Sequence, residues 1–424
     1  MVNKINIPKD LQELMKIILD NGYECYLVGG AVRDSIIGIE SKDYDLATNM
    51  PLEILKIKIP HVTIMKENAH RNTAIIRKNK YNYEFSLYKG KNIIEDLASR
   101  DFRINAMAVD LNGNLIDPFR GIENINQKII DLVKENGEGL VVDPLRILRA
   151  LRQAIKNNFS ISESTKKQIL LKKDLLNKVA PERIYQELKK ILVADDIEFY
   201  LREYKDIFFS IIPELKKCDG FKQYNDYHIY DVYEHIIKVV SSSPKNLYVR
   251  LAALFHDIGK PAKYVLDANG VGHFLGHAKV SVEIFKKFAN KYKIDNKTKK
   301  VVNDMILYHE GELSIKNNKI YNFYKKYNMS KIEFLFALKI ADIKGQNPKY
   351  INRINQLLKI KAKYIEIRNF YNEISYNGND LIKLGFKDKE IGIILDDIKR
   401  KIINNQLENK KEMINNYVIK NYKE

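Results

Sequence analysis

Two aspartates with one residue between them, Asp43 and Asp45, follow a glycine pair, Gly29-Gly30, and an arginine, Arg33. Glycine has no Cβ, so the backbone at Gly30 can approach a phosphate closely, and Arg33 can neutralise the phosphate charge. On a strand, residues two positions apart project from one face, where both carboxylates can hold a hard cation such as Mg²⁺. These residues predict Mg²⁺-assisted nucleotidyl transfer, with Asp43 and Asp45 as catalytic residues and metal ligands. Either half alone would be an ordinary turn or surface motif.

A second group of polar residues lies between Arg100 and Asn105. Arg100 or Arg103 can clamp a triphosphate through charge-assisted hydrogen bonds, and Asp101 and Asn105 can hold a ribose or orient the arginines. The alternative for this segment is a surface helix cap.

Asp143 and three arginines form a further candidate site. Asp143 is expected to cap a helix with Pro144 at its first position, and Arg146, Arg149 and Arg152 then lie on one face. A carboxylate and a guanidinium one turn apart can pair with the edge of cytosine or adenine, whereas guanine and uracil would leave buried groups unpaired. The alternatives are a plain helix cap and a solvated arginine face.

The chain has eight histidines, and they concentrate, together with aspartates, in the second half of the sequence. Imidazole and carboxylate ligands suit a divalent transition metal such as Mn²⁺ or Ni²⁺, which can activate water for phosphoester hydrolysis. The candidate residues are His228, Asp231, His235, His256, Asp257, His273, His277, His309 and Asp342. A single buried histidine is usually a hydrogen-bonded core residue, but this number of them favours a metal site.

The spacing of apolar residues predicts an α+β fold, in which a head with a small mixed sheet and helices is followed by an all-α region. A helix is expected over residues 8–21, and the apolar spacing becomes helical again from Asp143 onward. Between them, short apolar segments bounded by turn residues predict strands at 24–28, 61–65, 73–77, 83–88 and 104–111.

The composition favours a polyanionic partner, because the 424 residues carry a formal net charge of +18. AT-biased codon usage is an alternative source of part of the lysine excess. The two cysteines imply no disulfide framework, and no apolar run is long enough for a membrane span or a signal peptide. We therefore expect a cytoplasmic protein without a membrane partner.

Taken together, these segments resemble the class II nucleotidyltransferases, which comprise tRNA CCA-adding enzymes and bacterial poly(A) polymerases. The resemblance covers roughly the first 190 residues. It rests on Gly29–Asp34, Asp43–Asp45, Arg100–Ala106, Asp117–Phe119 with Gly121, Asp143–Arg146 with Arg149, and Glu182–Arg183 with Glu187.

The resemblance implies a nucleotidyltransferase head at 1–140, a helical neck with the base template at 141–200, an HD-type body at 201–350 and a basic helical tail at 351–424. It also implies tRNA, CTP and ATP as partners and substrates. In the head, it implies that Asp43 and Asp45 bind Mg²⁺ and that Asp143 with Arg146 selects the base. The nucleotide-binding residues would be Gly30, Arg33, Arg100, Asp101, Asn105, Asp143, Arg146, Arg149 and Arg152.

The histidine region, from about 225 to about 345, is similar to the HD superfamily of metal-dependent phosphohydrolases. This likeness implies that His235, His256, Asp257 and Asp342 are metal ligands. His277 and His309 would serve a second metal or the phosphate. The expected activity is that of a phosphatase or a 2′,3′-cyclic phosphodiesterase, and the alternative is a body that only binds tRNA.

Several positions depart from the family pattern. Val142, Arg103 and Gln153 stand where Glu, Thr and Phe are usual, and the loop at Tyr88–Asn92 is short. In this family the longer loop is associated with the switch from C to A addition, and members that add only CC have it shortened. The product is therefore open between CCA and CC. The further alternatives are a poly(A) polymerase and an enzyme that is chiefly an HD phosphohydrolase acting on RNA ends.

Overall fold

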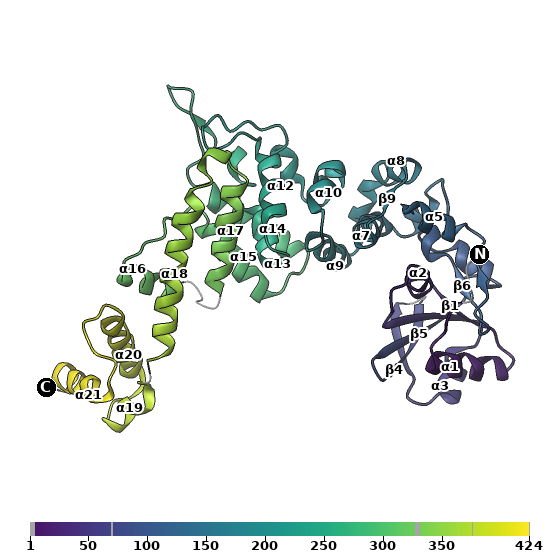
Figure 1. Cartoon of the computed structure of the whole chain (residues 1–424), viewed down its shortest axis with the longest axis horizontal. Helices are drawn as coiled ribbons and strands as arrows, with labels where there is room; N and C mark the ends of the chain where they lie inside the picture. The colour runs from purple at the N-terminus through teal and green to yellow at the C-terminus, as the bar shows by residue number, and fades with distance from the viewer. Residues whose placement is uncertain (1–4, 69–70, 327–330, 375, 424) are drawn as a thin grey trace. The chain divides into compact units, whose positions relative to one another are not determined.

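The computed structural model describes residues 5–423 except 69–70, 327–330 and 375. They form two compact units (Figure 1): one comprises Met1–Asp195 with Tyr204–Ile211, and the other Asp196–Glu203 with Ile212–Glu424. The first unit contains a mixed sheet and the second is helical apart from one short hairpin, so the predicted α+β class is confirmed.

The sheet of the first unit has seven strands in the order β3-β4-β5-β2-β1-β6-β7. β2 and β5 run parallel, and the other neighbours in the sheet pair antiparallel. The strands are β1 Cys25–Val28, β2 Asp43–Thr48, β3 Thr63–Asn68, β4 Arg71–Lys78, β5 Tyr81–Leu87, β6 Ala108–Val109 and β7 Leu115–Ile116. Placing β2 between β1 and β5 brings the Gly29-Gly30 turn and the two aspartates to one end of the sheet.

The strand predicted at 104–111 is mostly wrong. Only Ala108–Val109 is a strand, and Arg103–Asn105 forms a 3₁₀ turn. The Asn105 amide N–H donates to the Phe102 carbonyl, and the Asn105 side chain donates to the Asp101 carboxylate at 3.0 Å. These local bonds compete with a sheet ladder and close the turn.

The helix expected at 8–21 is confirmed as α1 (Lys9–Asp20), which buries Leu11, Leu14, Met15 and Ile18. The other α-helices of the first unit are α2 Gly30–Ile36, α3 Leu52–Lys58, α4 Ile93–Ala98, α5 Gly121–Gln127, α6 Glu138–Val142, α7 Arg146–Asn157, α8 Glu163–Leu171, α9 Pro181–Leu192 and α11 Lys205–Ile211. A short parallel pair, β8 (Ile129–Ile130) and β9 (Ser160–Ile161), joins the chain before α6 to the chain after α7.

The second unit has the helical character that the apolar spacing predicts. Its α-helices are α10 Ile197–Glu203, α12 Val232–Ser242, α13 Leu247–Phe255, α14 His277–Lys291, α15 Asn296–Tyr308, α16 Asn317–Lys326, α17 Ile332–Lys344, α18 Arg353–Asn372, α19 Gly378–Lys383, α20 Asp388–Ile403 and α21 Lys411–Tyr422. The turn at Asp267–Gly270 closes a hairpin of β10 (Val265–Leu266) and β11 (Gly272–His273). Residues after Tyr376 form their own apolar cluster around Leu381, Ile398 and Ile414.

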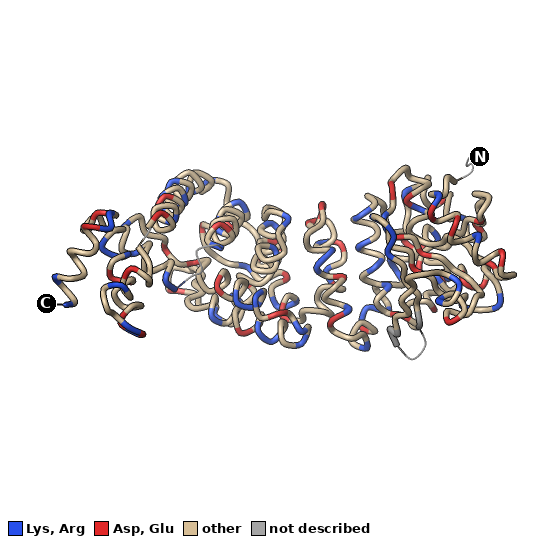
Figure 2. The backbone as a smooth tube through the Cα atoms, turned by 90° about the horizontal axis from the view of Figure 1, so that it is seen from below, with Lys and Arg blue, Asp and Glu red and all other residues tan. Residues whose placement is uncertain are grey.

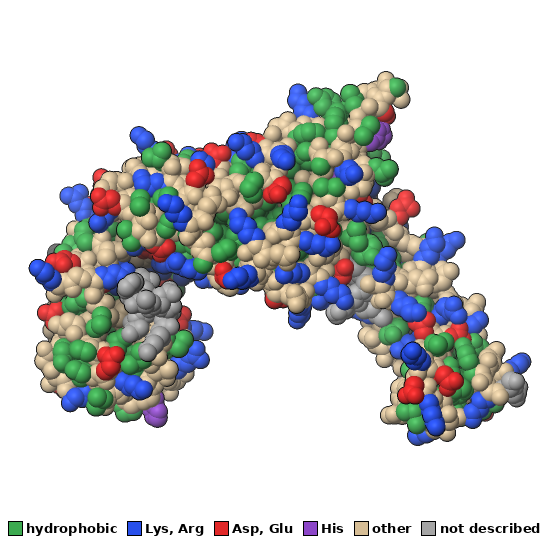
Figure 3. Space-filling view, turned by 180° about the vertical axis from the view of Figure 1, so that it is seen from behind, with side chains coloured by type: hydrophobic (Ala, Val, Ile, Leu, Met, Phe, Trp, Pro, Cys, Tyr) green, Lys and Arg blue, Asp and Glu red, His purple; other side chains and the backbone are tan. Residues whose placement is uncertain are grey.

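Charged residues are spread along both units. Figure 2 shows Lys and Arg along many helices, with Asp and Glu between them. On the face drawn in Figure 3, basic side chains are scattered over the helical unit and are not gathered into one patch. Among the described residues, none of the helices combines the length and apolar character needed to cross a membrane.

Candidate active sites

The turn between β1 and α2 brings the backbone close to charged side chains. Gly29 has a positive φ of 75°, and a Cβ placed on it would lie 3.0 Å from Arg100 Nη1 and 3.3 Å from Asp45 Oδ2. The backbone conformation therefore favours glycine here, and a Cβ would be in tight contact with both side chains. The predicted phosphate-binding turn, the metal-binding aspartate and the predicted triphosphate clamp meet at this point.

β2 presents Asp43 and Asp45 on one face, because buried and exposed residues alternate at this end of the strand. The parallel register with β5 places Asn82 beside Asp43 and Glu84 beside Asp45, and Asn82 Nδ2 donates to Asp43 Oδ1 at 2.7 Å. Glu84 thus lies on the strand position next to the aspartate pair.

The Asp45 carboxylate reaches solvent but has protein on most sides. Burial raises its pKa, Arg100 opposes this effect, and the charge of Asp43 raises the pKa further. A carboxylate pair with this excess of negative charge fits a divalent cation such as Mg²⁺, which would remove the repulsion.

These residues line one pocket of about 770 Å³, a volume within the usual range for small-molecule sites. All the residues predicted to bind the nucleotide or Mg²⁺ line it: Gly30, Arg33, Asp43, Asp45, Arg100, Asp101 and Asn105 of the predicted head, and Asp143, Arg146, Arg149 and Arg152 of the predicted neck. The tertiary structure therefore gathers segments separated by about a hundred positions of sequence into one cavity, as the prediction of a single nucleotide site requires.

Arg33 is buried and held by three side chains. Its Nε donates to Asp34 Oδ1 at 2.9 Å, and its Nη1 donates to Asn105 Oδ1 at 2.6 Å and to Gln153 Oε1 at 3.3 Å. Gln153, at the position where the family usually has Phe, thus helps to fix the plane of this guanidinium.

Arg100 is fixed by Asp96 of α4. The Asp96 Oδ2 accepts from Arg100 Nε at 3.1 Å and from Nη2 at 2.9 Å, and Asp96 Oδ1 accepts from the Lys89 backbone N–H at 3.0 Å. The short loop that carries Lys89 is therefore linked through one buried carboxylate to the arginine beside Asp45.

The prediction that Asp143 caps the arginine-bearing helix is wrong. α7 begins at Arg146, while Asp143 ends α6 with extended backbone, and its carboxylate lies 3.4 Å from Arg183 Nη2. Arg146 donates through Nη2 to the Ser99 carbonyl at 2.7 Å and through Nη1 to the Arg100 carbonyl at 3.1 Å. Asp143 and Arg146 still line the same pocket.

The other two arginines of α7 are paired with buried carboxylates. Arg149 Nη2 lies 2.7 Å from Asp101 Oδ2, and Arg152 Nε donates to Glu187 of α9 at 2.5 Å. Burial by itself would raise the pKa of Asp101, but the charges of Arg149 and Arg146 and the hydrogen bonds from Asn105 and the Phe102 N–H together lower it. A solvated arginine face is excluded by these contacts.

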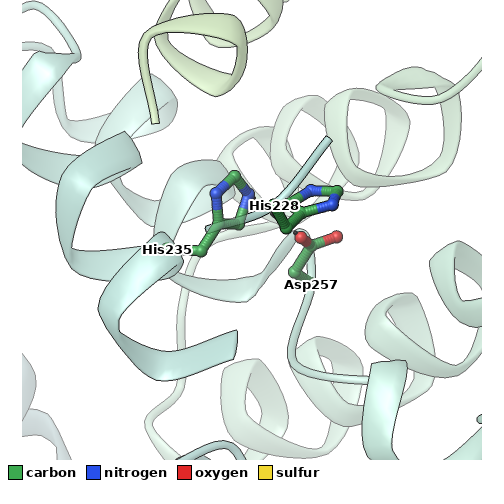
Figure 4. Close-up of side chains that lie close together, drawn as sticks. All are labelled: His228, His235 and Asp257. Atoms are coloured by element: carbon green, nitrogen blue, oxygen red, sulfur yellow. Dashed lines mark ion pairs between the residues drawn. The ribbon is translucent and has the colours of Figure 1, made fainter. Parts of the chain in front are cut away.

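In the second unit, six predicted residues converge from five helices. His235 lies on α12, His256 and Asp257 directly follow α13, His277 begins α14, His309 directly follows α15, and Asp342 lies on α17. His235 Nε2 is 3.1 Å from both Asp257 Oδ2 and Asp342 Oδ1, and His277 Nε2 is 2.9 Å from Asp257 Oδ1. Figure 4 shows the His228 ring above the Asp257 carboxylate, with His235 beside them.

The histidine tautomers fit bound metal. Each Nδ1 faces a backbone carbonyl: His235 that of Gly345 at 3.0 Å, His256 that of Ala253 at 2.7 Å, His277 that of Phe274 at 2.9 Å and His309 that of Ile306 at 2.6 Å. A carbonyl only accepts, so we assign the ring proton to Nδ1, which leaves each Nε2 lone pair facing the cluster.

These lone pairs meet in two groups. The Nε2 atoms of His235 and His256 are 3.2 Å apart, and those of His277 and His309 are 3.3 Å apart. Facing lone pairs repel, and a shared cation relieves this. Asp257 has one oxygen beside each pair, so the donor set fits transition-metal ions.

Two predicted members of the cluster lie elsewhere. Asp231 caps α12, because its carboxylate accepts from the Glu234 N–H at 2.7 Å and from the Gly220 N–H at 3.2 Å. His273 lies on β11, mostly exposed, 2.7 Å from Asp267. Both assignments to the cluster are therefore wrong: one carboxylate serves its own helix, and the hairpin carries the histidine away.

One charged contact was missed. Lys260 Nζ lies 2.6 Å from Asp257 Oδ2, 2.8 Å from Gln223 Oε1 and 3.4 Å from His228 Nε2. Lys260 follows Asp257 by three residues, and this spacing could have predicted the ion pair. No sequence pattern predicts the contact between Lys260 and Gln223.

Comparison with protein families matches three parts of the chain. Residues 25–131 match the poly A polymerase head domain, residues 158–218 match a probable RNA and SrmB-binding site of polymerase A, and residues 225–344 match the HD domain.

Curated relatives have corresponding names. A multifunctional CCA protein of Legionella pneumophila is 30% identical over 295 residues, which cover 64% of this chain and 70% of that protein. A CC-adding tRNA nucleotidyltransferase of Halalkalibacterium halodurans is 37% identical over 175 residues, 41% of this chain, and the match spans only 46% of that protein.

A solved structure of the Bacillus stearothermophilus CCA-adding enzyme in complex with CTP has a TM-score of 0.65 and 21% identity, over 97% of this chain and 96% of that one. This likeness shows a shared fold along nearly the whole chain.

Proposed function

The chain belongs to the family of class II CCA-adding enzymes and bacterial poly(A) polymerases with RNA-binding and HD domains, and from this premise we propose that it adds C and A to tRNA 3′ ends. CTP and ATP are the proposed substrates. The observation that supports this most is the single pocket of about 770 Å³ that holds the aspartate pair, the arginine beside it and the proposed base-reading pair.

Asp43 and Asp45 are the proposed ligands of Mg²⁺. A bound Mg²⁺ supplies charge neutralisation on the triphosphate and lowers the pKa of the attacking hydroxyl. Arg100, oriented by Asp96, then faces the triphosphate beside Asp45. Arg33, held by Asp34 and Asn105, completes the positive wall of the pocket.

The base is proposed to be read by Asp143 and Arg146. The Asp143 carboxylate accepts from the exocyclic amine of cytosine or adenine, and the Arg146 guanidinium donates to the adjacent ring acceptor. The carbonyls of Ser99 and Arg100 fix the plane of that guanidinium before the nucleotide arrives. Guanine and uracil present the opposite pattern and would leave the pair unsatisfied.

A second candidate product, CC alone, is favoured by the short loop. The Lys89 and Lys91 N–H groups donate to Asp96 and Glu95, and the Asn92 side chain caps α4. Gly90 has a φ of 111°, and a Cβ there would lie 2.5 Å from Glu95 Oε2. A turn bonded in this way has few ways to rearrange between C and A addition.

Extension of three tRNA transcripts tests both candidates. The transcripts end before CCA, after C and after CC, each receives CTP, ATP or both, and products are sequenced. Addition of CC and then one A supports the CCA product, and arrest at CC supports the loop argument. Long A tails without C identify a poly(A) polymerase, and no extension contradicts the proposal.

We further propose that the histidine cluster hydrolyses phosphoesters with a transition metal. His235, His256, Asp257 and Asp342 are the proposed ligands, with His277 and His309 at the other oxygen of Asp257. A bound metal supplies a water nucleophile at neutral pH. Lys260, 2.6 Å from Asp257, neutralises charge beside the phosphate.

Protein loaded with Mn²⁺ or Ni²⁺ is assayed on 2′,3′-cyclic AMP and p-nitrophenyl phosphate. Hydrolysis of either that is lost in His256→Ala and kept in Asp43→Ala supports this second activity. Failure on both substrates with both metals contradicts it and leaves the cluster as a metal-binding part of an RNA-binding body.

A further inference from the structure

The histidine cluster opens to solvent on one side. The side chains of His235, His256, Asp257, His277 and His309 are at most 3% exposed. The Asp342 side chain is 18% exposed. Asp342 is the most exposed of these six side chains, so solvent reaches the cluster at Asp342.

A guanidinium stands at this opening. Gln346 lies just after the end of α17, four residues beyond Asp342. Its Nε2 donates to Asp342 Oδ1 at 3.3 Å, and its Oε1 accepts from Arg353 Nη1 at 3.3 Å. Gln346 is only 9% exposed, whereas Arg353 is exposed. The Gln346 side-chain amide thus lies between Asp342 and the Arg353 guanidinium, and the guanidinium is on the solvent side.

Aromatic rings hold Arg353 in place. Its guanidinium carbon lies 5.6 Å from the centre of the Tyr227 ring, and Tyr227 stacks on Tyr350 with ring centres 4.6 Å apart. The Asn347 N–H donates to the Tyr227 carbonyl at 2.8 Å. A guanidinium pinned by a ring loses less freedom when it binds an anion.

The Arg353 guanidinium adds a positive charge beside the Asp342 carboxylate at the opening. Among the described residues, no carboxylate lies within ion-pair distance of the Arg353 guanidinium. Lys339 lies nearby, with its Nζ 2.8 Å from the Gly311 carbonyl, close enough for its charge to interact with those of Asp342, Arg353 and Glu310. Two cations at the mouth of a hydrolytic site fit a substrate with more than one negative group.

We propose that Arg353 binds the phosphodiester on the 5′ side of the nucleotide whose terminal phosphate enters the histidine cluster. The inference rests on the proposed hydrolytic activity and gives it a substrate class: an RNA 3′ end with a 2′,3′-cyclic phosphate, in preference to a mononucleotide. Lys260 lies inside the cluster beside Asp257 and serves the reacting phosphate. The guanidinium, offset by the Gln346 amide, meets the next phosphate along the strand.

The test compares two substrates on metal-loaded full-length protein: 2′,3′-cyclic AMP, which has one phosphate, and ApA with a terminal 2′,3′-cyclic phosphate, which has an additional internal diester. The variants are Arg353→Gln and, as a matched loss of charge on the same helix, Lys359→Gln. KM and kcat are measured separately over a range of salt concentrations. Binding of the product, ApA with a 3′-phosphate, is measured by calorimetry.

We expect the wild type to have the lower KM for the dinucleotide. Arg353→Gln should raise that KM and weaken product binding by about tenfold, as expected for a lost charge-assisted hydrogen bond, with kcat and the cyclic AMP kinetics unchanged. The slope of log KM against log salt should fall by about 0.7 for one lost contact to a single strand. Lys359→Gln should behave as wild type.

Equal effects of Arg353→Gln on both substrates would indicate a structural role and overturn the inference, as would a wild type without preference for the dinucleotide. If neither substrate is hydrolysed, the proposed hydrolysis fails. In that case, weaker product binding in Arg353→Gln than in the wild type would still support a contact between Arg353 and the phosphodiester. Unchanged product binding would contradict that contact.

Discussion

The head pocket and the histidine cluster differ in how their charged and polar groups are paired. In the head pocket, most arginines already have protein partners: Arg149 pairs with Asp101, Arg152 with Glu187, and Arg100 with Asp96. In the histidine cluster, four Nε2 lone pairs and the carboxylates converge in a buried space. The head is thus preorganised by its own ion pairs, whereas the histidine cluster is completed only by a cation.

The largest expected effect separates the two clusters. Asp43→Asn should reduce nucleotide addition by at least about a thousandfold, roughly 4 kcal/mol of transition-state stabilisation, because one carboxylate of the proposed Mg²⁺ pair loses its charge. Hydrolysis should be unchanged. His256→Ala should give the reverse pattern, measured with tRNA extension and 2′,3′-cyclic AMP hydrolysis on the same preparations. Parallel loss of both activities in either variant would show that the sites are not independent.

The second prediction concerns metal and stability. Mn²⁺ at about a hundred times its Kd should stabilise the folded helical unit by about 2.7 kcal/mol, which corresponds to a rise in Tm of about 5–10 °C. The rise should be absent in His256→Gln and present in Asp43→Asn, as measured by calorimetry after treatment with a chelator. An equal rise in His256→Gln would place the stabilising ion elsewhere.

A third prediction tests the ion pairs of the head. Replacing Arg152 by Gln leaves the Glu187 carboxylate, whose side chain is 11% exposed, without its partner. We expect a loss of about 1–3 kcal/mol in the free energy of unfolding. Most of it should be recovered in the Arg152→Gln, Glu187→Gln double variant, measured by urea denaturation. If the KM for CTP is raised in Arg152→Gln and stays raised in the double variant, in which the stability has recovered, Arg152 also contacts the nucleotide.

The smallest effect is expected from an ion network outside both clusters. Burial by itself would raise the pKa of Glu198, but hydrogen bonds from Lys238, Arg202 and Ser241 lower it to about 2. A lowered folded pKa means that this stabilisation is complete above the ordinary value of about 4.5 and is lost as the pH falls toward 2.

Glu198→Gln should therefore flatten this acid limb in a plot of unfolding free energy against pH. The difference should stay below about 1 kcal/mol, because the network is partly solvated. An unchanged acid limb would mean that other carboxylates dominate it.

Sequence alone determined the features that depend on a few neighbouring residues. Asp43 and Asp45 share a face because a strand alternates every residue, and His256-Asp257 lies at a helix end. The Gly29-Gly30 pair also predicts its turn from local sequence, because the positive φ of Gly29 is a property of the turn itself. The helix at the start of the chain and the helical character of the second half follow from apolar spacing in the same way.

Only the tertiary structure decided which charged groups meet. Asp143 precedes a proline and reads as a helix cap, but α6 ends there and Arg183 from α9 takes its carboxylate. Residue type and neighbours do not distinguish Asp231 from Asp342, and only the likeness to the HD superfamily singled out Asp342; in the structure Asp231 caps its own helix and Asp342 faces His235. The partners in these contacts lie far apart in the sequence. The distance between them is set by how whole helices pack, and the pattern of neighbouring residues does not encode that packing.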